Sequence, residues 1–316
     1  MKKLVAIFSF LLLSSPFFAF AEGAGSGYDH YYQRAYFLSH RPFPYDDLKE
    51  DVDWLCSPRY EGRKAGSEAA GELAWELAER FEQIGLKALV TEGYLQEFEL
   101  SNHQRGRNVI GALEGSSGKW IVLAAYYDGL GMHQGQHYAG ADANAAGLAC
   151  MMELARKMAG EGEQLKDGLI FVALDAHYDS NKGAQALLDR LKGQKIRLFV
   201  NLEQLGNSLA PVDKRRPHYL MALGAEKYSR ELKACARLGR IEMYYEYYRS
   251  ESFTNMFYRK LGDQSVFVKA GIPALLFTAG ITEHTNKSSD IPQNLDFLAL
   301  YERGLCLERW LRCINR

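Results

Sequence analysis

The sequence lacks closely spaced cysteines. Its 316 residues contain only five, and no two of them form the CxxC pair that indicates a zinc knuckle. Because five is an odd number, at least one thiol stays free or pairs between chains. We expect most of them to be small buried apolar residues rather than a disulfide framework. The five are Cys56, Cys150, Cys235, Cys306 and Cys313.

The sequence also lacks an excess of charge of either sign. Lysine and arginine number 38, aspartate and glutamate number 39, and the net charge is −1. No basic run stands out, so we expect no nucleic-acid partner. The sequence also lacks a GxxxxGK[ST] phosphate loop, a GxGxxG motif after a first strand and a GxSxG nucleophile motif. These absences argue against the common nucleotide-binding and serine-hydrolase sites.

Residues 1–21, MKKLVAIFSFLLLSSPFFAFA, have the pattern of a signal peptide. Two lysines precede an apolar core, which ends in the small-x-small sequence Ala-Phe-Ala. We expect cleavage before Glu22 and export to a periplasm or to the medium, with residues 22–316 forming a single aminopeptidase-like α/β domain. The residue directly after the expected cleavage point is Glu22 and not a cysteine, so a lipid anchor is not expected. No later stretch is apolar enough to predict a membrane span.

Apolar strands alternate with amphipathic helices along almost the whole chain. Strands are predicted at 107–115, 120–131, 169–178, 196–206, 218–224, 241–248 and 272–280. Helices are predicted at 68–85, from Asn144 to 160, and at 182–193, 229–239 and 295–314. This alternation is typical of one α/β domain with a mostly parallel, twisted central sheet covered by helices on both faces.

The candidate site residues follow from that fold. In such sheets a ligand site lies beyond the carboxyl ends of the strands. The polar and aromatic residues that end the predicted strands, or lie in the loops after them, are Tyr126, Tyr127, Asp128, Asp175, His177, Tyr178, Glu203, Glu283 and His284.

Several short blocks support a more specific interpretation. They are EGRKAGS at 61–67, WIVLAAYYDGLG at 120–131, GADANAAG at 140–147, LDAHYDSNKG at 174–183, VNLEQLGN at 200–207, GDQSVFVKAGIP at 262–273 and EHTNKSSD at 283–290. In type and order they resemble the zinc aminopeptidase family of metallopeptidases, which includes the glutaminyl cyclases. The resemblance covers nearly all of the chain after residue 21 and implies a zinc-exopeptidase-like fold.

The same resemblance implies that most of the family's metal ligands are replaced. In the family, two zinc ions share a bridging aspartate, and a glutamate acts as general base. Ala143 stands in the place of the bridge, and a methyl group has no lone pair to donate. His284 is the only zinc ligand kept as the same residue. The other replacements are Tyr126 for a zinc-binding histidine, His177 for the general base, Tyr178 for a zinc-binding glutamate and Glu203 for a zinc-binding aspartate.

These replacements predict a homologue that is not a catalyst and needs no cofactor. Glu203 and His284 are the only surviving residues of metal-ligand type, and His177 holds the position of the general base. The former active-site cleft is expected to bind a peptide end or a small amine. Its binding residues are expected to include Tyr126, Asp128, Asp142 and Tyr178.

Other interpretations stay open at this point. The chain could be an active, zinc-dependent aminopeptidase or a glutaminyl cyclase-like enzyme with a rebuilt site, for example one metal held by His177, Glu203 and His284. A metal at His133 and His137 is also conceivable, although the glycines around them favour a loop over a helix. A third possibility is a structural partner in an exported assembly.

Overall fold

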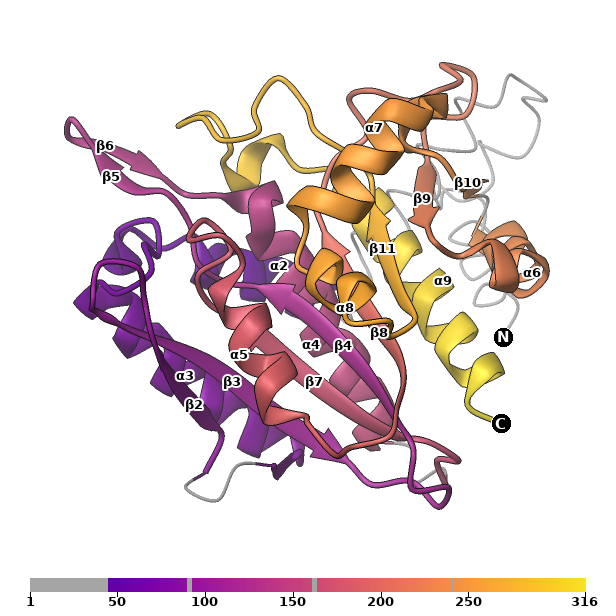
Figure 1. The fold of residues 1–316 in the computed structure, drawn as a ribbon. Coiled ribbons are helices and arrows are strands. Elements are labelled where there is room, and N and C mark those ends of the chain that lie inside the picture. The colour runs from indigo at the N-terminus through magenta and orange to yellow at the C-terminus, as the bar shows by residue number, and fades with distance from the viewer. Residues whose placement is uncertain (1–44, 90–92, 161–163, 240) are drawn as a thin grey trace, which may run out of the picture. The chain divides into compact units, whose positions relative to one another are not determined.

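The computed structural model describes residues 45–89, 93–160, 164–239 and 241–316. The predicted signal peptide at 1–21 lies outside these residues. Within them the centre is a nine-stranded sheet of order β1-β3-β7-β4-β8-β11-β9-β10, with β2 paired to β3 (Figure 1). Its strands are β1 Lys87–Ala88, β2 Leu95–Glu99, β3 Arg105–Leu113, β4 Trp120–Tyr126, β7 Gly168–Leu174, β8 Ile196–Glu203, β9 Tyr219–Leu223, β10 Glu242–Tyr244 and β11 Ala274–Thr278.

The core of the sheet is parallel. Strand β4 runs parallel to both β7 and β8, and β8 runs parallel to β11. On the flanks, β3 is antiparallel to β7, and β9 is antiparallel to β11. Every residue of β7 is buried, as the continuous apolar run of its sequence predicts for a strand covered on both faces. The predicted α/β fold with a mostly parallel central sheet is therefore confirmed, and the antiparallel flanks are an addition to it.

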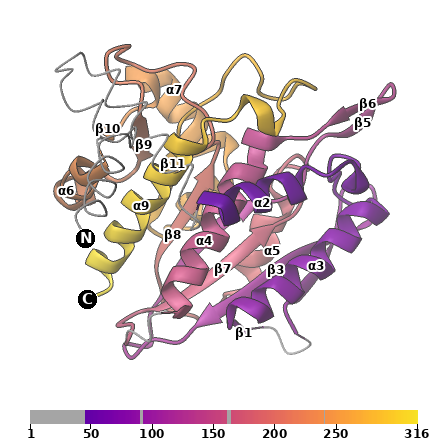
Figure 2. The same ribbon diagram turned by 180° about the vertical axis from the view of Figure 1, so that it is seen from behind.

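Helices cover both faces of the sheet. Figure 2 shows α2, α3, α4 and α9 on one face, and Figure 1 shows α5 and α8 on the other. The larger apolar cluster lies under the first set, and the smaller cluster packs Leu187 of α5 and Phe267 of α8 against the second face. The helices are α2 Tyr45–Leu55, α3 Glu68–Ile84, α4 Ala146–Gly160, α5 Lys182–Arg190, α6 Ser229–Gly239, α7 Glu251–Met256, α8 Gln264–Lys269 and α9 Phe297–Ile314. In this part of the chain, none of them has the length and apolar character needed to cross a membrane.

Two segments differ from the sequence-based expectation. The predicted strand at 241–248 is only three residues long, and the aromatic run after it forms short helices, including the π-helical turn η5 Phe257–Leu261. Tertiary packing overrides the strand preference of its tyrosines, because Tyr247 stacks on Phe257 at 4.1 Å between ring centroids. Helix α4 begins at Ala146 rather than Asn144, because the backbone of Asn144 is not helical (φ −144°, ψ 36°).

The cysteines behave as predicted for small apolar residues. All five are free thiols, and only Cys313 is exposed. Burial raises the pKa of the Cys56 thiol to about 11 and that of the Cys150 thiol to about 12. These two thiols therefore stay protonated and unreactive at neutral pH.

Arg63 connects the segments that surround the sheet edge where the site lies. Its side chain is fully buried, and its guanidinium donates hydrogen bonds only to backbone carbonyls. The acceptors are Leu55 at 2.7 Å, Tyr127 at 2.7 Å, Ala139 at 2.6 Å and Gly140 at 2.9 Å. One side chain thus provides hydrogen-bond donors for backbone carbonyls at the end of α2, after β4 and in the loop before the turn η2 Ala141–Ala145.

We predict that Arg63→Met lowers the free energy of unfolding by at least about 3 kcal/mol, because it leaves several buried carbonyls without a donor. Urea denaturation followed by circular dichroism measures the change. Arg59→Met is the matched control, since the Arg59 side chain is 59% exposed and makes only surface ion pairs. A loss below about 1 kcal/mol at Arg63 contradicts the prediction.

Candidate functional site

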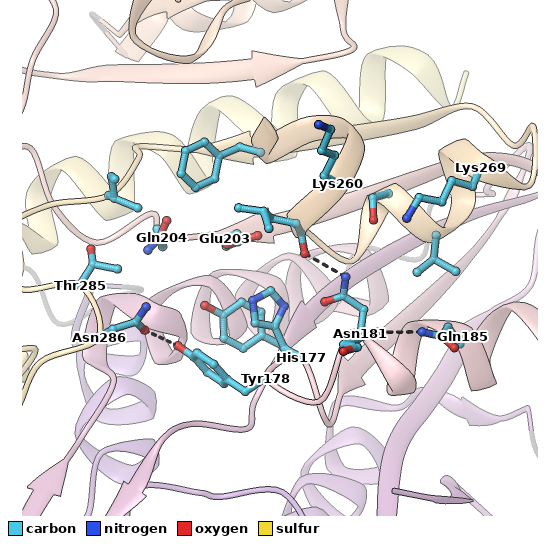
Figure 3. A pocket seen from close by; sticks show the side chains of 17 residues that line it. His177, Tyr178, Asn181, Gln185, Glu203, Gln204, Lys260, Lys269, Thr285 and Asn286 are labelled. Atoms are coloured by element: carbon cyan, nitrogen blue, oxygen red, sulfur yellow. Dashed lines mark hydrogen bonds between the residues drawn. The ribbon is translucent and has the colours of Figure 1, made fainter. Parts of the chain in front are cut away.

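A cavity of about 580 Å³ lies at the carboxyl ends of the parallel strands (Figure 3). Tyr126 is the last residue of β4 and Glu203 is the last residue of β8, and both line it. His177 and Tyr178, from the loop after β7, line it as well. The cavity therefore lies at the sheet edge where the strand pattern predicts a site.

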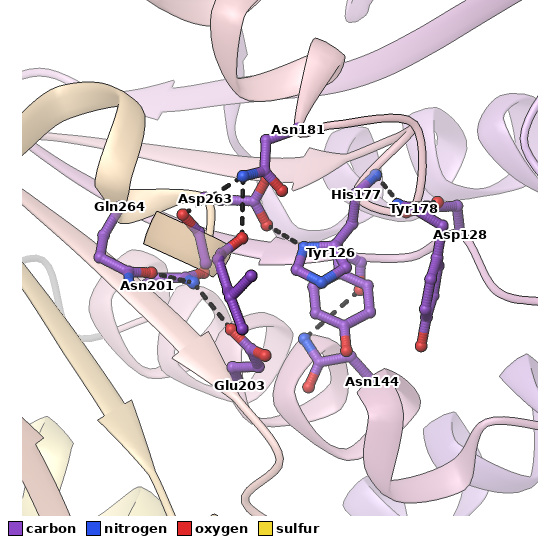
Figure 4. A network of polar contacts seen from close by, with 12 residues as sticks. Tyr126, Asp128, Asn144, His177, Tyr178, Asn181, Asn201, Glu203, Asp263 and Gln264 are labelled. Carbon is purple, nitrogen blue, oxygen red and sulfur yellow. Dashed lines mark hydrogen bonds and ion pairs between the residues drawn. The ribbon is translucent and has the colours of Figure 1, made fainter. Parts of the chain in front are cut away.

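His177 is held on two sides. Its Nδ1 lies 2.9 Å from a carboxylate oxygen of Asp263, a fully buried residue just before α8. Its ring stacks on Tyr126 with 3.9 Å between the centroids and 9° between the planes. Figure 4 shows the imidazole between these two partners. These two contacts fix the orientation of the His177 side chain, which also lines the cavity.

The ion pair sets the charge of this imidazole. Burial favours the neutral ring, but the Asp263 carboxylate, with smaller contributions from Glu203 and Asp128, outweighs it and raises the pKa of His177 to about 9. Burial also raises the pKa of Glu203, while the positive charge of His177 opposes that change. At neutral pH the cavity wall therefore carries an imidazolium next to an acidic side chain.

Asp128 supports the same loop from beneath. Its carboxylate accepts hydrogen bonds from the backbone N–H of His177 at 2.9 Å and of Tyr178 at 3.2 Å. Burial, together with the charge of nearby Asp175, raises the pKa of Asp128. Asp128 is completely buried and does not line the cavity. It fixes the position of the loop instead of presenting an oxygen to a ligand.

The two tyrosines retain their protons. Tyr178 donates a hydrogen bond from its hydroxyl to Asn286 Oδ1 at 2.7 Å, and its ring packs edge-on against Tyr126 with 6.0 Å between centroids. Burial raises the pKa of both phenols, strongly so for Tyr126. Neither is therefore set to become a phenolate ligand for a metal.

Ala143 and its neighbour are engaged through the backbone. The N–H groups of Asp142 and Ala143 donate to the two carboxylate oxygens of Asp290, at 2.8 and 3.0 Å. The side chain of Asp142 accepts from the N–H of Gly206 at 2.7 Å and from the amide of Asn207. Asp142 is buried and does not line the cavity. The structure therefore separates it from Tyr126 and Tyr178, with which the sequence grouped it.

His284 also lies apart from the cavity wall. Its Nδ1 is 3.0 Å from the Ser289 hydroxyl, and the residue is absent from the lining. The other histidine pair does not converge either. In the hairpin of β5 (Gly131–His133) and β6 (Gln136–Tyr138), His133 pairs with Gln136 and Met132 pairs with His137. Successive pairs face opposite sides of a ribbon, so these two imidazoles point apart.

The donors present do not fit the zinc pair that the resemblance implies. Tyr126 is buried with its pKa raised, so its phenol keeps its proton, and Ala143 offers only a methyl group. Across the described ranges, 45–89, 93–160, 164–239 and 241–316, no group of three or more His, Cys, Asp or Glu side chains could hold a metal ion. A catalytic zinc commonly has three protein ligands.

Comparison with known proteins decides the family. The model of peptidase family M28 matches residues 108–304. The chain belongs to peptidase family M28. No curated protein is similar enough in sequence to count as a match.

Solved structures agree with M28 membership at the level of the fold. The LapA aminopeptidase of Legionella pneumophila aligns with a TM-score of 0.68 and 15% identity, over 86% of this chain and 72% of its own. BSAP, a zinc aminopeptidase from Bacillus subtilis, gives 0.67 and 13%, over 86% and 95%. The glutaminyl cyclase of Porphyromonas gingivalis gives 0.65 and 16%, over 86% and 99%. The suspected zinc aminopeptidase and glutaminyl cyclase fold is thus confirmed.

Sequence reasoning missed several residues around the cavity of this M28 member. Asp263 lies in the GDQSVFVKAGIP block, which was recognised only as part of a resemblance. Asn181 donates to the carbonyl of Leu261 at 2.9 Å, and Asn286 accepts from Tyr178. No motif marks the remaining polar lining residues, which are Ser180, Gln185, Gln204, Lys260, Ser265, Lys269 and Thr285.

We predict a pH-dependent contribution of the His177–Asp263 pair to stability. Because folding raises the pKa of His177 from about 6.5 to about 9, the contribution is complete below about pH 6.5 and is lost as the pH rises through 9. In urea denaturation, His177→Gln should be less stable than wild type by roughly 3 kcal/mol at pH 6, with a smaller deficit at pH 10.

The exposed His103 supplies the control, since His103→Gln should show a small effect at every pH. A deficit at position 177 that is the same at pH 6 and pH 10 contradicts the ion-pair assignment. The loss of ring stacking accounts only for the part of the deficit that does not depend on pH.

Proposed function

We propose that this M28 protein is a non-catalytic binding protein that holds a peptide amino terminus or a small amine in the cavity. The observation that carries the proposal is the fixed position of His177. Its ring fills the place that the resemblance gives to the general base, and Tyr126 and Asp263 occupy it from two sides. A side chain committed in this way supports binding more than metal-assisted hydrolysis.

Glu203 supplies the chemistry for an amine. Its carboxylate lines the cavity and accepts only one protein hydrogen bond within the described residues, from Asn201 at 3.3 Å. An ammonium group would supply the positive charge that this desolvated carboxylate requires. The rings of Tyr126, Tyr178 and Phe257 line the same cavity and favour a cation or an apolar stem.

The proposal also holds that the zinc site of the family has lost its metal-binding ability in this chain. Ala143 cannot bridge two ions, and a shared anion normally offsets their repulsion. Water free of metal has a pKa near 15.7, against about 7 when it is bound to zinc. With a pKa of about 9, His177 is already protonated at neutral pH and would not serve as a general base. We also propose, from the pattern of residues 1–21, that the protein acts after export, in a periplasm or outside the cell.

We predict that a short peptide with a free amino terminus binds, and that its N-acetylated form binds at least about tenfold more weakly. Glu203→Gln should weaken binding of the free peptide to the level of the acetylated one. Isothermal titration calorimetry measures both affinities. Glu97→Gln is the control, because Glu97 makes surface ion pairs on β2. Equal binding of the two peptides contradicts the proposal.

We predict that the purified protein, dialysed after loading with Zn²⁺, retains far less than one zinc per chain by elemental analysis. It should also show no aminopeptidase turnover with added Zn²⁺. Stoichiometric zinc, together with turnover abolished by a chelator and by His284→Ala, would instead establish the alternative, an aminopeptidase or cyclase with a rebuilt site.

A further inference from the structure

The cavity carries positive charge as well as Glu203. Lys260, from η5, and Lys269, from α8, both line it. Figure 3 shows them on the side of the cavity away from Tyr178. Both residues are exposed, and no carboxylate in the described chain lies within ion-pair distance of either ammonium. Two like charges that face one cavity are stabilised when an anion binds between them.

A buried donor accompanies these lysines. Ser265 lines the cavity and is completely buried, and its hydroxyl has no hydrogen-bond partner among the described residues. Ser265 and Lys269 are four positions apart on α8 and therefore lie on the same face of the helix. Buried hydroxyls are normally paired, so this unpaired group indicates a place for an acceptor.

The segment that bears the lysines is fixed relative to the rest of the site. Asp263 ties the residue before α8 to His177, and the amide of Asn181 bonds the carbonyl of Leu261 at the end of η5. The chain on either side of Gly262 is thus anchored to the loop after β7 (Figure 4). The backbone segment that carries Lys260 and Lys269 is therefore held in place by the contacts of Asp263 with His177 and of Asn181 with Leu261.

From this arrangement we propose that the cavity selects a ligand with both an ammonium and a carboxylate, namely an N-terminal glutamate or aspartate. The ammonium pairs with Glu203, and the side-chain carboxylate lies between Lys260, Lys269 and the hydroxyl of Ser265. This inference rests on the proposed function and adds the chemical class of the ligand. Charge-assisted hydrogen bonds from lysine to a carboxylate are stronger than those to a neutral amide, which provides the selectivity.

The test compares peptide amides that differ only in the first residue. Calorimetry at low salt should give Glu-Ala-Ala-amide a Kd about tenfold below that of Gln-Ala-Ala-amide. The preference should shrink at 0.5 M NaCl, roughly as expected for partly exposed charges. K260M/K269M should reduce the preference to less than about twofold, mainly by weakening binding of the Glu peptide. Ser265→Ala should weaken binding of the Glu peptide more than binding of the Gln peptide.

The matched control is K119M/K195M, which removes the same charge from two exposed lysines. Lys119 directly precedes β4 and Lys195 directly precedes β8, so both lie at the ends of these strands away from the cavity. This control should leave the preference intact. Free glutamate provides a second arm. If it binds as tightly as the peptide and is equally sensitive to K260M/K269M, the charge assignment holds and the free amino acid is the ligand.

The outcomes separate the two proposals. If Glu and Gln peptides bind equally and both are lost in Glu203→Gln, the acidic selectivity is wrong and the amine-binding function stands. A tenfold preference that survives K260M/K269M also overturns the assignment. If neither peptide nor free glutamate binds the wild-type protein, the proposed function and this inference both fail.

Discussion

The ion pair between His177 and Asp263 is the interaction on which the candidate site depends. It joins the loop after β7 to the start of α8, two segments that lie more than eighty residues apart in sequence. Because Tyr126 covers one face of the imidazole, the pair is shielded from water and its charges interact more strongly than on a surface. The walls of the cavity follow from it, since one side comes from the β7 loop and another from η5 and α8.

Under the proposed function, this member of the family would recognise a polar ligand without a metal. A zinc pair concentrates positive charge at one point, where it can activate water. Here positive charge is distributed over His177 and the two lysines, and Glu203 lines the same cavity. Such a site can bind a charged molecule by direct ion pairs and still lack the means to generate a strong nucleophile. The proposed loss of turnover is compatible with family membership, because a fold does not fix the chemistry of its site.

The sequence predicted the fold more completely than the site. Continuous apolar runs such as β7 and helices such as α3, with Ser67 as its N-cap and Gly85 after its last turn, carry local signals that identify them. Three residues that the strand-end rule selected, Tyr126, His177 and Glu203, line one cavity. Asp142 and His284 lie outside the lining of that cavity. Residues distant in sequence, Gly206, Asn207 and Asp290, hold Asp142, whereas His284 contacts the nearby Ser289. Asp263, Lys260 and Lys269 could not be identified as site residues from the sequence, because the short helices after the aromatic run show no clear periodicity.

The contact of Asp290 with Asp142 and Ala143 has a consequence for how such a site changes over time. Among the described residues its carboxylate bonds to two backbone N–H groups, so these two bonds do not depend on which side chain position 143 carries. A carboxylate there can be exchanged for a methyl group without removing either bond that shapes the turn. The shape of this loop and the chemistry of its side chain are thus separable. A lineage can lose the metal-binding side chain and still keep the fold of the loop.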